Sequence, residues 1–355
     1  MFDYIIFPSI KVPSKYSISS IVSAVFIFCL FIQVITGILL AMHYNSSDAF
    51  NSIEVMTNRV FLGWLLRNIH ITGVTCLFIC AYLLLFLGIY NGDYQRGADV
   101  VWFLFISCFL LLCAIVFLGY VLPWGQMSYW GATVITSVFG VFSETFKRWF
   151  LGDYALSEVS LIRFTALHYI MPFILLGFIC LYGFFLWCYN LKYKNYHVYV
   201  RDCLYVYLFF IIIVAIIASY FIFFNIDFLL SGDNYFERDK FKTPLVIMPE
   251  WYFLPYYSIL KAIPYQFLGA VMMVFAMGIY IILPLVDYTD HNSWVFKIFF
   301  YLLIISILVL CLCSLYYDNG YGLYIMRVCI LYYFSFFTVI LPGLSLFQLN
   351  KQTIN

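Results

Sequence analysis

The sequence predicts an all-α membrane protein with eight transmembrane helices. Of its 355 residues, 65% are hydrophobic and only 10% are charged, and the mean hydropathy is +0.99. Soluble globular domains carry about 25% charged residues, so these proportions exclude that class. A helix needs roughly 20 apolar residues to cross the hydrocarbon core of a bilayer. Stretches of that length without Asp, Glu, Lys or Arg recur along the whole chain.

Eight such stretches give the expected spans. They are Ile18–Met42, Ile69–Tyr90, Val100–Leu122, Phe164–Leu191, Cys203–Ile226, Tyr265–Val286, Ile298–Tyr317 and Val328–Leu349. The uncharged stretch continues past the third span to Ser143, but glycine and proline interrupt it between Gly119 and Gly131, and we expect a loop or a short helix at the membrane surface there. We divide the chain into an N-terminal four-helix bundle, residues 1–202, and a C-terminal transmembrane region, residues 203–355.

Charge and cysteine usage exclude several functions. The formal net charge of +1 offers no basic field for nucleic acid. The spans hold almost no charged residues to line a polar path, which argues against a transporter or channel. The eleven cysteines lie mostly inside apolar runs, without the spacing of a disulfide or zinc framework. The chain therefore offers no ligand cluster for an iron–sulfur centre of its own.

Two of the five histidines, His70 and His168, lie within predicted spans, deep enough to bind a cofactor. An imidazole in a low-dielectric helix bundle is costly unless it has a partner. Histidines on facing helices can ligate a haem iron from both sides. The alternative is a pair of hydrogen-bonded core imidazoles.

Two glycines and two arginines suit a haem at this position. Gly37 in the first span and Gly119 in the third would let a flat ring approach two helix backbones, because glycine has no side chain. Close helix packing explains each glycine equally well. Arg67 and Arg163 fall near the same predicted membrane face as the histidines and could neutralise haem propionates.

The long connection Ser231–Pro264 contains the run Pro249-Glu250-Trp251-Tyr252. Long ordered loops often carry function. A carboxylate in an apolar, aromatic loop suits a group that accepts a proton from a hydroquinone as its electrons leave. Glu250 could instead cap a helix or pair with Lys261.

Several motifs resemble mitochondrial cytochrome b. The longest is Gly119–Thr136, and Thr36–Tyr44, Gly63–His70, Arg163–His168 and Pro249–Tyr252 extend the resemblance, in order, over essentially the whole chain. The resemblance implies the quinol-oxidising subunit of a dimeric bc1 complex, a ubiquinol–cytochrome c oxidoreductase of the mitochondrial inner membrane. It also implies a Rieske iron–sulfur protein and cytochrome c1 as partners, surrounding lipids, and a respiratory supercomplex as a further assembly.

The resemblance also implies site residues. His70, His168, Gly37 and Gly119 match the pattern for the low-potential haem b nearer the quinol-oxidation site, and Glu250 matches the proton acceptor. The aromatic wall of the quinol pocket would be Tyr120, Tyr129, Tyr252 and Tyr257, and its further lining Met127, Gly131, Ile135 and Pro249. Ordinary packing is the alternative for the aromatic positions, because the chain has 32 tyrosines and 40 phenylalanines.

The second haem of the family is expected to be absent. Its histidines would stand fourteen positions after His70 and His168, where this chain has Leu84 and Tyr182. The corresponding glycine positions hold Ser23 and Phe105, and an expected arginine is Leu87. We therefore expect one haem b, with apolar and aromatic side chains closing the second cavity. A second haem ligated by Tyr182 is the alternative, since tyrosine can bind haem iron.

The family's quinone-reduction site is altered as well. Its histidine corresponds to Trp187, and its Lys-Asp pair appears as Arg201-Asp202. Asp202 could exchange a proton with a quinone, but we favour a solvated acid at a helix start. These losses raise a second functional hypothesis, a cytochrome b kept as the structural and assembly core of the complex while its catalysis has weakened.

Overall fold

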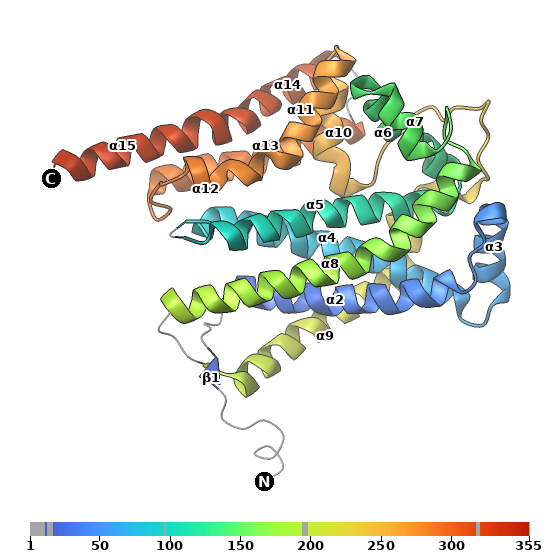
Figure 1. Cartoon of the computed structure of the whole chain (residues 1–355), viewed down its shortest axis with the longest axis horizontal. Helices are drawn as coiled ribbons and strands as arrows, with labels where there is room; N and C mark the ends of the chain where they lie inside the picture. Colours follow the sequence, from blue (N-terminus) through green and yellow to red (C-terminus); the bar gives the residue numbers. More distant parts are fainter. Residues whose placement is uncertain (1–10, 13–16, 96, 194–197, 317–319, 355) are drawn as a thin grey trace, which may run out of the picture. The chain divides into compact units, whose positions relative to one another are not determined.

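The structure, a computed structural model, describes residues 11–12, 17–95, 97–193, 198–316 and 320–354, with the side chains of all but 11–12, 193, 198–202 and 349–354. The described part is almost entirely helical (Figure 1). Eight helices are long and apolar enough to cross a membrane: Ile18–Ala41, Gly63–Asn91, Asp99–Val121, Glu158–Lys192, Cys203–Phe224, Gln266–Val286, Trp294–Tyr316 and Gly320–Gln348. Each overlaps one predicted span, so the predicted fold class is confirmed.

Most of the helices follow one another with short connections, whereas the long connection of residues 225–253 separates α9 from α10. The helices are α2 (Ile18–Ala41), α3 (Ala49–Arg59), α4 (Gly63–Asn91), α5 (Asp99–Val121), α6 (Gln126–Phe142), α7 (Glu144–Leu151), α8 (Glu158–Tyr193), α9 (Val200–Phe224), α10 (Leu254–Ala262), α11 (Gln266–Gly278), α12 (Leu283–Val286), α13 (Trp294–Tyr316), α14 (Gly320–Ser335) and α15 (Leu341–Ile354). A π-helical turn, Phe336–Ile340, joins α14 to α15. Two short strands, β1 (Lys11–Val12) and β2 (Val198–Tyr199), pair antiparallel.

The segment after the third span contains more helix than we expected. Instead of a loop or one short helix, α6 and α7 follow α5 with only short breaks. The break before α6 is the run Leu122–Gly125, in which Trp124 has a positive φ of 59°. α7 begins where the Ser143 side chain accepts a hydrogen bond from the Phe146 amide, and it ends at Gly152 in the left-handed conformation. The glycines inside this segment do not stop the helices.

The chain divides into two compact units, which we describe separately. Unit 1 comprises Met1–Gly88, Ser107–Ser128 and Leu161–Lys240, and unit 2 comprises Ile89–Ile106, Tyr129–Ser160 and Phe241–Asn355. These units differ from our division into residues 1–202 and 203–355, which stays a prediction.

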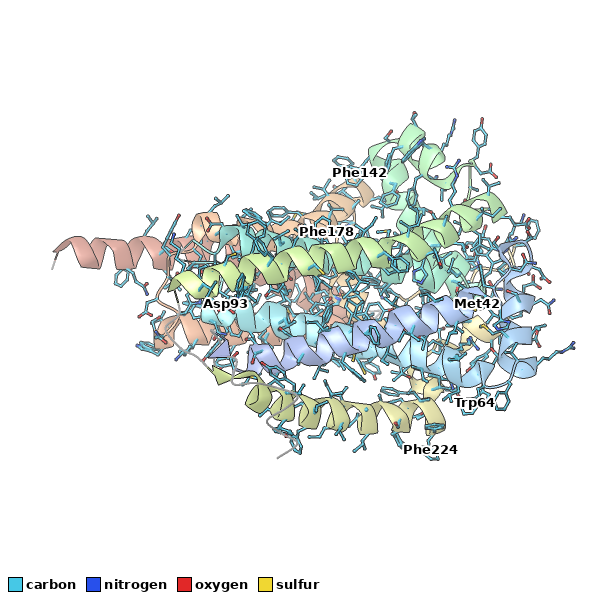
Figure 2. All side chains as sticks on the ribbon, turned by 60° about the horizontal axis from the view of Figure 1, so that its bottom comes forward. Met42, Trp64, Asp93, Phe142, Phe178 and Phe224 are labelled. Atoms are coloured by element: carbon cyan, nitrogen blue, oxygen red, sulfur yellow. The ribbon has the colours of Figure 1, made fainter. Side chains whose placement is uncertain are left out.

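Unit 1 contains α2, α8, α9, most of α4 and the second half of α5. α2 packs against α9 (Figure 1). The start of α4 meets the end of α9, because the Trp64 and Phe223 rings lie 6.0 Å apart and the Asn68 amide donates a hydrogen bond to the Ile222 carbonyl at 3.1 Å. Figure 2 shows Met42, Trp64 and Phe224 at the same end of this unit.

Unit 2 is built around α10, α11, α13 and α14, which pack against one another. A buried polar network joins three of its segments. The carboxylate of Asp287 accepts hydrogen bonds from Tyr94, from the His291 ring at 3.0 Å and from the Thr289 amide at 2.8 Å. Ser345 on α15 lies 3.0 Å from the Thr289 hydroxyl. The network ties α15 to the connection between α4 and α5 and to the connection between α12 and α13.

Candidate functional site

His70 on α4 and His168 on α8 face each other inside unit 1. Their ring centroids lie 6.4 Å apart and the ring planes make an angle of 84°. An ion ligated by two opposed imidazoles separates the ring centres by about 6 Å, given metal–nitrogen bonds of about 2.0–2.1 Å. The spacing of the two rings therefore fits a metal held between them, and haem iron is the metal that such a pair holds in a helix bundle.

Hydrogen bonds assign the ligand atom of each histidine. Nδ1 of His168 donates to the Ile115 carbonyl at 2.8 Å. The Thr36 hydroxyl donates to the Ile32 carbonyl at 2.8 Å, so Thr36 Oγ1 accepts from Nδ1 of His70 at 3.0 Å. Metal-binding histidines commonly donate their second ring N–H in this way. Nε2 of each ring keeps its lone pair for a metal.

Both predicted glycines lie directly against these rings. A Cβ atom added at Gly37 would stand 3.2 Å from Cε1 of His70, and one added at Gly119 would stand 2.5 Å from Cε1 of His168. The second distance is shorter than real Cβ contacts allow. The absence of a side chain at these positions is therefore a condition for the observed ring positions.

The two predicted propionate-binding arginines have different environments. Arg67 is half-buried on α4, and its Nη1 donates to the Thr57 hydroxyl at 3.4 Å. Arg163 is exposed on α8, five positions before His168. Their pairing with propionates stays a prediction.

Sequence reasoning missed a buried amide beside the histidines. Gln33 on α2 is 7% exposed, and its Nε2 donates to the carbonyl of Ile69 at 3.4 Å. Its Oε1 is buried without a hydrogen-bond partner among the described residues. A Cβ atom at Gly73 would lie 1.8 Å from Gln33 Nε2. The available signal was a lone glutamine in an apolar span, one turn before Gly37.

The positions expected to hold a second haem carry no imidazole. Ser23, Leu84 and Tyr182 lie in unit 1 on α2, α4 and α8, and Phe105 lies on α5 in unit 2. Elsewhere on α4, on the other side of the helix from Leu84, the ring of Tyr82 stacks on Phe86 with centroids 6.0 Å apart and meets Phe109 edge-on at 5.5 Å. The absence of the second haem stays a prediction.

The predicted quinol-site residues are divided between the units. Tyr120 and the buried Met127 belong to unit 1. The others belong to unit 2: Tyr129, Gly131 and Ile135 on α6, and Pro249, Glu250, Tyr252 and Tyr257 at and before α10. Tyr129 and Tyr252 are buried. The Glu250 side chain does not cap the 3-10 turn Trp251–Phe253 that follows it.

The predicted quinone-reduction residues are less well described. Trp187 is 51% exposed on α8. Arg201 and Asp202 begin α9, and their side chains lie outside the described residues. Their roles stay predictions.

Two family models match the chain. One, described as Cytochrome b/b6/petB, matches residues 7–190, and the other, Cytochrome b(C-terminal)/b6/petD, matches residues 237–334. Together they include both histidines, both glycines and the run Pro249–Tyr252.

Individual relatives agree with the family models. Cytochrome b of Dictyostelium discoideum is 36% identical over 334 residues, covering 84% of each chain. Cytochrome b of Rickettsia prowazekii is 36% identical over 342 residues, covering 90% of this chain and 85% of its own. The Cytochrome b/c1 of Bradyrhizobium diazoefficiens is 33% identical over 94% of this chain, which spans only 51% of that relative.

A solved structure has the same fold. A chain of a hyperthermophilic respiratory complex III superposes with a TM-score of 0.89 at 25% identity, covering 98% of this chain and 96% of that one.

Proposed function

Because this chain belongs to the cytochrome b family, as its relatives over nine-tenths of its length establish, we propose that it is the cytochrome b subunit of a respiratory complex III, a ubiquinol–cytochrome c oxidoreductase. The observation that carries the proposal is the opposed pair His70 and His168, each with Nδ1 hydrogen-bonded and Nε2 left for a metal. The superposition on a complex III chain supports it. The eight apolar helices make it a multi-pass membrane protein, and we propose the mitochondrial inner membrane as its location.

The chain's own residues would hold one low-potential haem b. His70 and His168 would ligate the iron through Nε2, Gly37 and Gly119 would leave room beside the rings, and Arg67 and Arg163 would pair with the propionates. When bound, the haem supplies a one-electron redox centre between α4 and α8.

Ubiquinol oxidation releases two electrons and two protons. We assign Glu250 the acceptance of one proton, and the other would be released to water. One electron would pass to a partner Rieske iron–sulfur protein and onward to cytochrome c1, and the other to the haem. The aromatic residues Tyr120, Tyr129, Tyr252 and Tyr257 would enclose the quinol ring, with Met127, Gly131, Ile135 and Pro249 lining the rest of the pocket. The motif residues support these roles by resemblance.

The test is quinol-dependent reduction of cytochrome c by the complex in its membrane. Glu250→Gln should lower the rate at least about 100-fold, the usual loss when a general base is removed. Glu237→Gln, which changes an exposed carboxylate in the same connection, is the matched control and should leave the rate unchanged. An unchanged rate in Glu250→Gln would remove Glu250 from its assigned role.

We also propose that the second haem is absent. Leu84 and Tyr182 replace its ligands, Ser23 and Phe105 stand at its glycine positions, and Leu87 replaces an arginine. A reduced-minus-oxidised spectrum combined with haem-to-protein stoichiometry should give one b haem per chain. Two haems would overturn the proposal, and loss of one of them in Tyr182→Phe would identify Tyr182 as a ligand.

The missing second-haem ligands favour a second candidate function, a structural and assembly core with weakened catalysis. In that case the quinone-reduction site at Arg201 and Asp202 would be inactive and Asp202 would be a solvated acid. The Glu250→Gln assay separates the two functions, because in a core with weakened catalysis the wild-type rate would already be low and the substitution would lower it little.

A further inference from the structure

The start of α6 has no cap of its own. The residue before the helix is Gly125, which has no side chain to accept hydrogen bonds from the first amides. The first four amide groups of any helix lack partners inside the helix. At α6, two of these amides bond to a distant segment. The Gln126 amide donates to the Phe236 carbonyl at 3.1 Å, and the Ser128 amide donates to Oδ1 of Asn234 at 2.9 Å.

That segment, Ser231–Arg238, lies across the turn before α6 as a strap within unit 1. Glu237 pairs with Gly125 in an antiparallel bridge, and the Arg238 amide donates to the Trp124 carbonyl at 3.3 Å. The Arg238 guanidinium lies 4.8 Å from the centre of the Trp124 ring. These contacts hold Trp124 in its left-handed conformation, which costs about 1–3 kcal/mol in a residue other than glycine.

Gly125 is required for the strap to approach. A Cβ atom there would stand 2.8 Å from both the carbonyl oxygen and Oδ1 of Asn234, and 2.9 Å from its Cα. Backbone atoms cannot give way cheaply at such distances. The strap can therefore pack this closely against the turn only while residue 125 is glycine.

Both the oxygen and the nitrogen of the Asn234 side-chain amide make hydrogen bonds. Oδ1 accepts from the Ser128 amide at 2.9 Å and lies 3.3 Å from the Ser128 hydroxyl, while Nδ2 donates to the Tyr120 hydroxyl at 3.2 Å. Ser128 is fully buried, and its hydroxyl donates to the Tyr120 carbonyl at 2.8 Å. One half-buried side chain thus joins the end of α5 to the start of α6.

We infer that Asn234 is a positioning residue for quinol oxidation: it caps α6 from outside the helix and orients the hydroxyl of Tyr120. The inference rests on the proposed function, in which Tyr120 and Met127 belong to the quinol pocket. Because Nδ2 of Asn234 donates to the Tyr120 oxygen, this hydrogen bond fixes which way the Tyr120 hydroxyl is turned. Met127, the second residue of α6, is fixed through the same cap.

The kinetic test uses the assembled complex with a short-chain ubiquinol. Asn234→Ala should lower kcat/KM for quinol about 10- to 100-fold, as a small misplacement of binding groups does. The reduced haem spectrum should not change, because the hydrogen bonds that orient His70 and His168 go to Thr36 and Ile115, which lie outside the strap. Asp233→Asn, which alters the exposed neighbouring side chain, is the control and should match the wild type.

A second variant distinguishes the effect of Asn234 on Tyr120 from its effect as the cap of α6. Asn234→Asp keeps an oxygen for the Ser128 amide but has no N–H for Tyr120, so the tyrosine would turn its own proton to the carboxylate. Its loss in kcat should vanish in a Tyr120→Phe background. Additive losses in the double variant would mean that Asn234 does not act through Tyr120.

Hydrogen exchange tests the cap independently of activity. Asn234→Ala should speed exchange of the amides at the start of α6 about fivefold, and Asn234→Asp should not. Wild-type exchange and wild-type kcat/KM in Asn234→Ala would overturn the inference and leave the proposed function standing. A wild-type complex without quinol-dependent activity would overturn the proposed function, while the exchange result would still decide on the cap.

Discussion

Thr36 connects α2 to the first proposed haem ligand, since its hydroxyl oxygen accepts a hydrogen bond from Nδ1 of His70 at 3.0 Å. The corresponding acceptor for His168 is a backbone carbonyl, at Ile115, which no substitution removes. A substitution can therefore remove the hydrogen-bond acceptor of His70 but not that of His168.

Thr36→Val should weaken haem binding about 10- to 100-fold, because it leaves the second ring nitrogen of His70 without its acceptor. Haem retention during dilution in detergent measures this. Thr338→Val is the matched control, because Thr338 also donates to a carbonyl one turn back, that of Phe334, and touches no histidine. Equal haem loss in the two variants would show that the hydrogen bond to His70 has no role in ligation.

Gly119→Ala should be more damaging than Gly37→Ala. The added methyl would lie 2.5 Å from the His168 ring in the first variant and 3.2 Å from the His70 ring in the second. We expect loss of the haem spectrum in Gly119→Ala and partial retention in Gly37→Ala. Gly177→Ala on the same helix as His168 should be harmless, since nothing lies within 4 Å of its added Cβ. A normal haem spectrum in Gly119→Ala would contradict the proposed haem position.

The network around Asp287 should make stability depend on pH at the acidic end. Burial raises the pKa of Asp287, but hydrogen bonds from His291, Tyr94 and Thr289 outweigh it and hold the pKa below its ordinary value. A lowered folded-state pKa contributes stability above the unfolded value of about 3.9, and this stability is lost as the pH falls through the folded value. The Tm in detergent should decline as the pH falls below about 4, and the Asp287→Asn variant should not show this decline.

Tyr94 should produce the opposite dependence at alkaline pH. Burial and the adjacent Asp287 carboxylate raise the pKa of Tyr94 well above its ordinary value. Its contribution to stability is fully present below about pH 10 and is lost as the pH rises beyond that. Tyr94→Phe should remove this dependence and cost about 1.5–3 kcal/mol at neutral pH, the usual value of a hydrogen bond to a charged group. Tyr288→Phe, at a neighbouring exposed tyrosine, should cost nothing measurable.

Much of the fold could be predicted from the sequence because lipid imposes a simple rule. A span must be long and apolar, and all eight predicted spans have a counterpart in the structure. The pairing of His70 with His168 followed from the cost of placing an imidazole in a span. The extent of α6 was not predictable in the same way, because glycines next to an apolar run are compatible with either a loop or a helix.

The contacts of Asn234 and Gln33 could not be predicted from local pattern. Asn234 caps a helix that begins 108 positions earlier in the chain, and Gln33 packs on a glycine of another helix. No periodicity or motif in the sequence indicates either contact, because each depends on how closely two segments that are distant in the chain approach one another. Capping rules that consider only the residues before a helix would assign α6 no cap at all.

The close approach of Gln33 to Gly73 has a consequence for how this sequence can change over time. A methyl group at position 73 would lie 1.8 Å from the amide nitrogen at position 33, so the Gln33 amide would have to move. Gln33 would then turn away and give up its hydrogen bond to the Ile69 carbonyl, or a shorter residue would replace it. Relatives that carry a larger residue at position 73 are therefore expected to lack this hydrogen bond, either through a different side-chain position or through a second substitution at position 33.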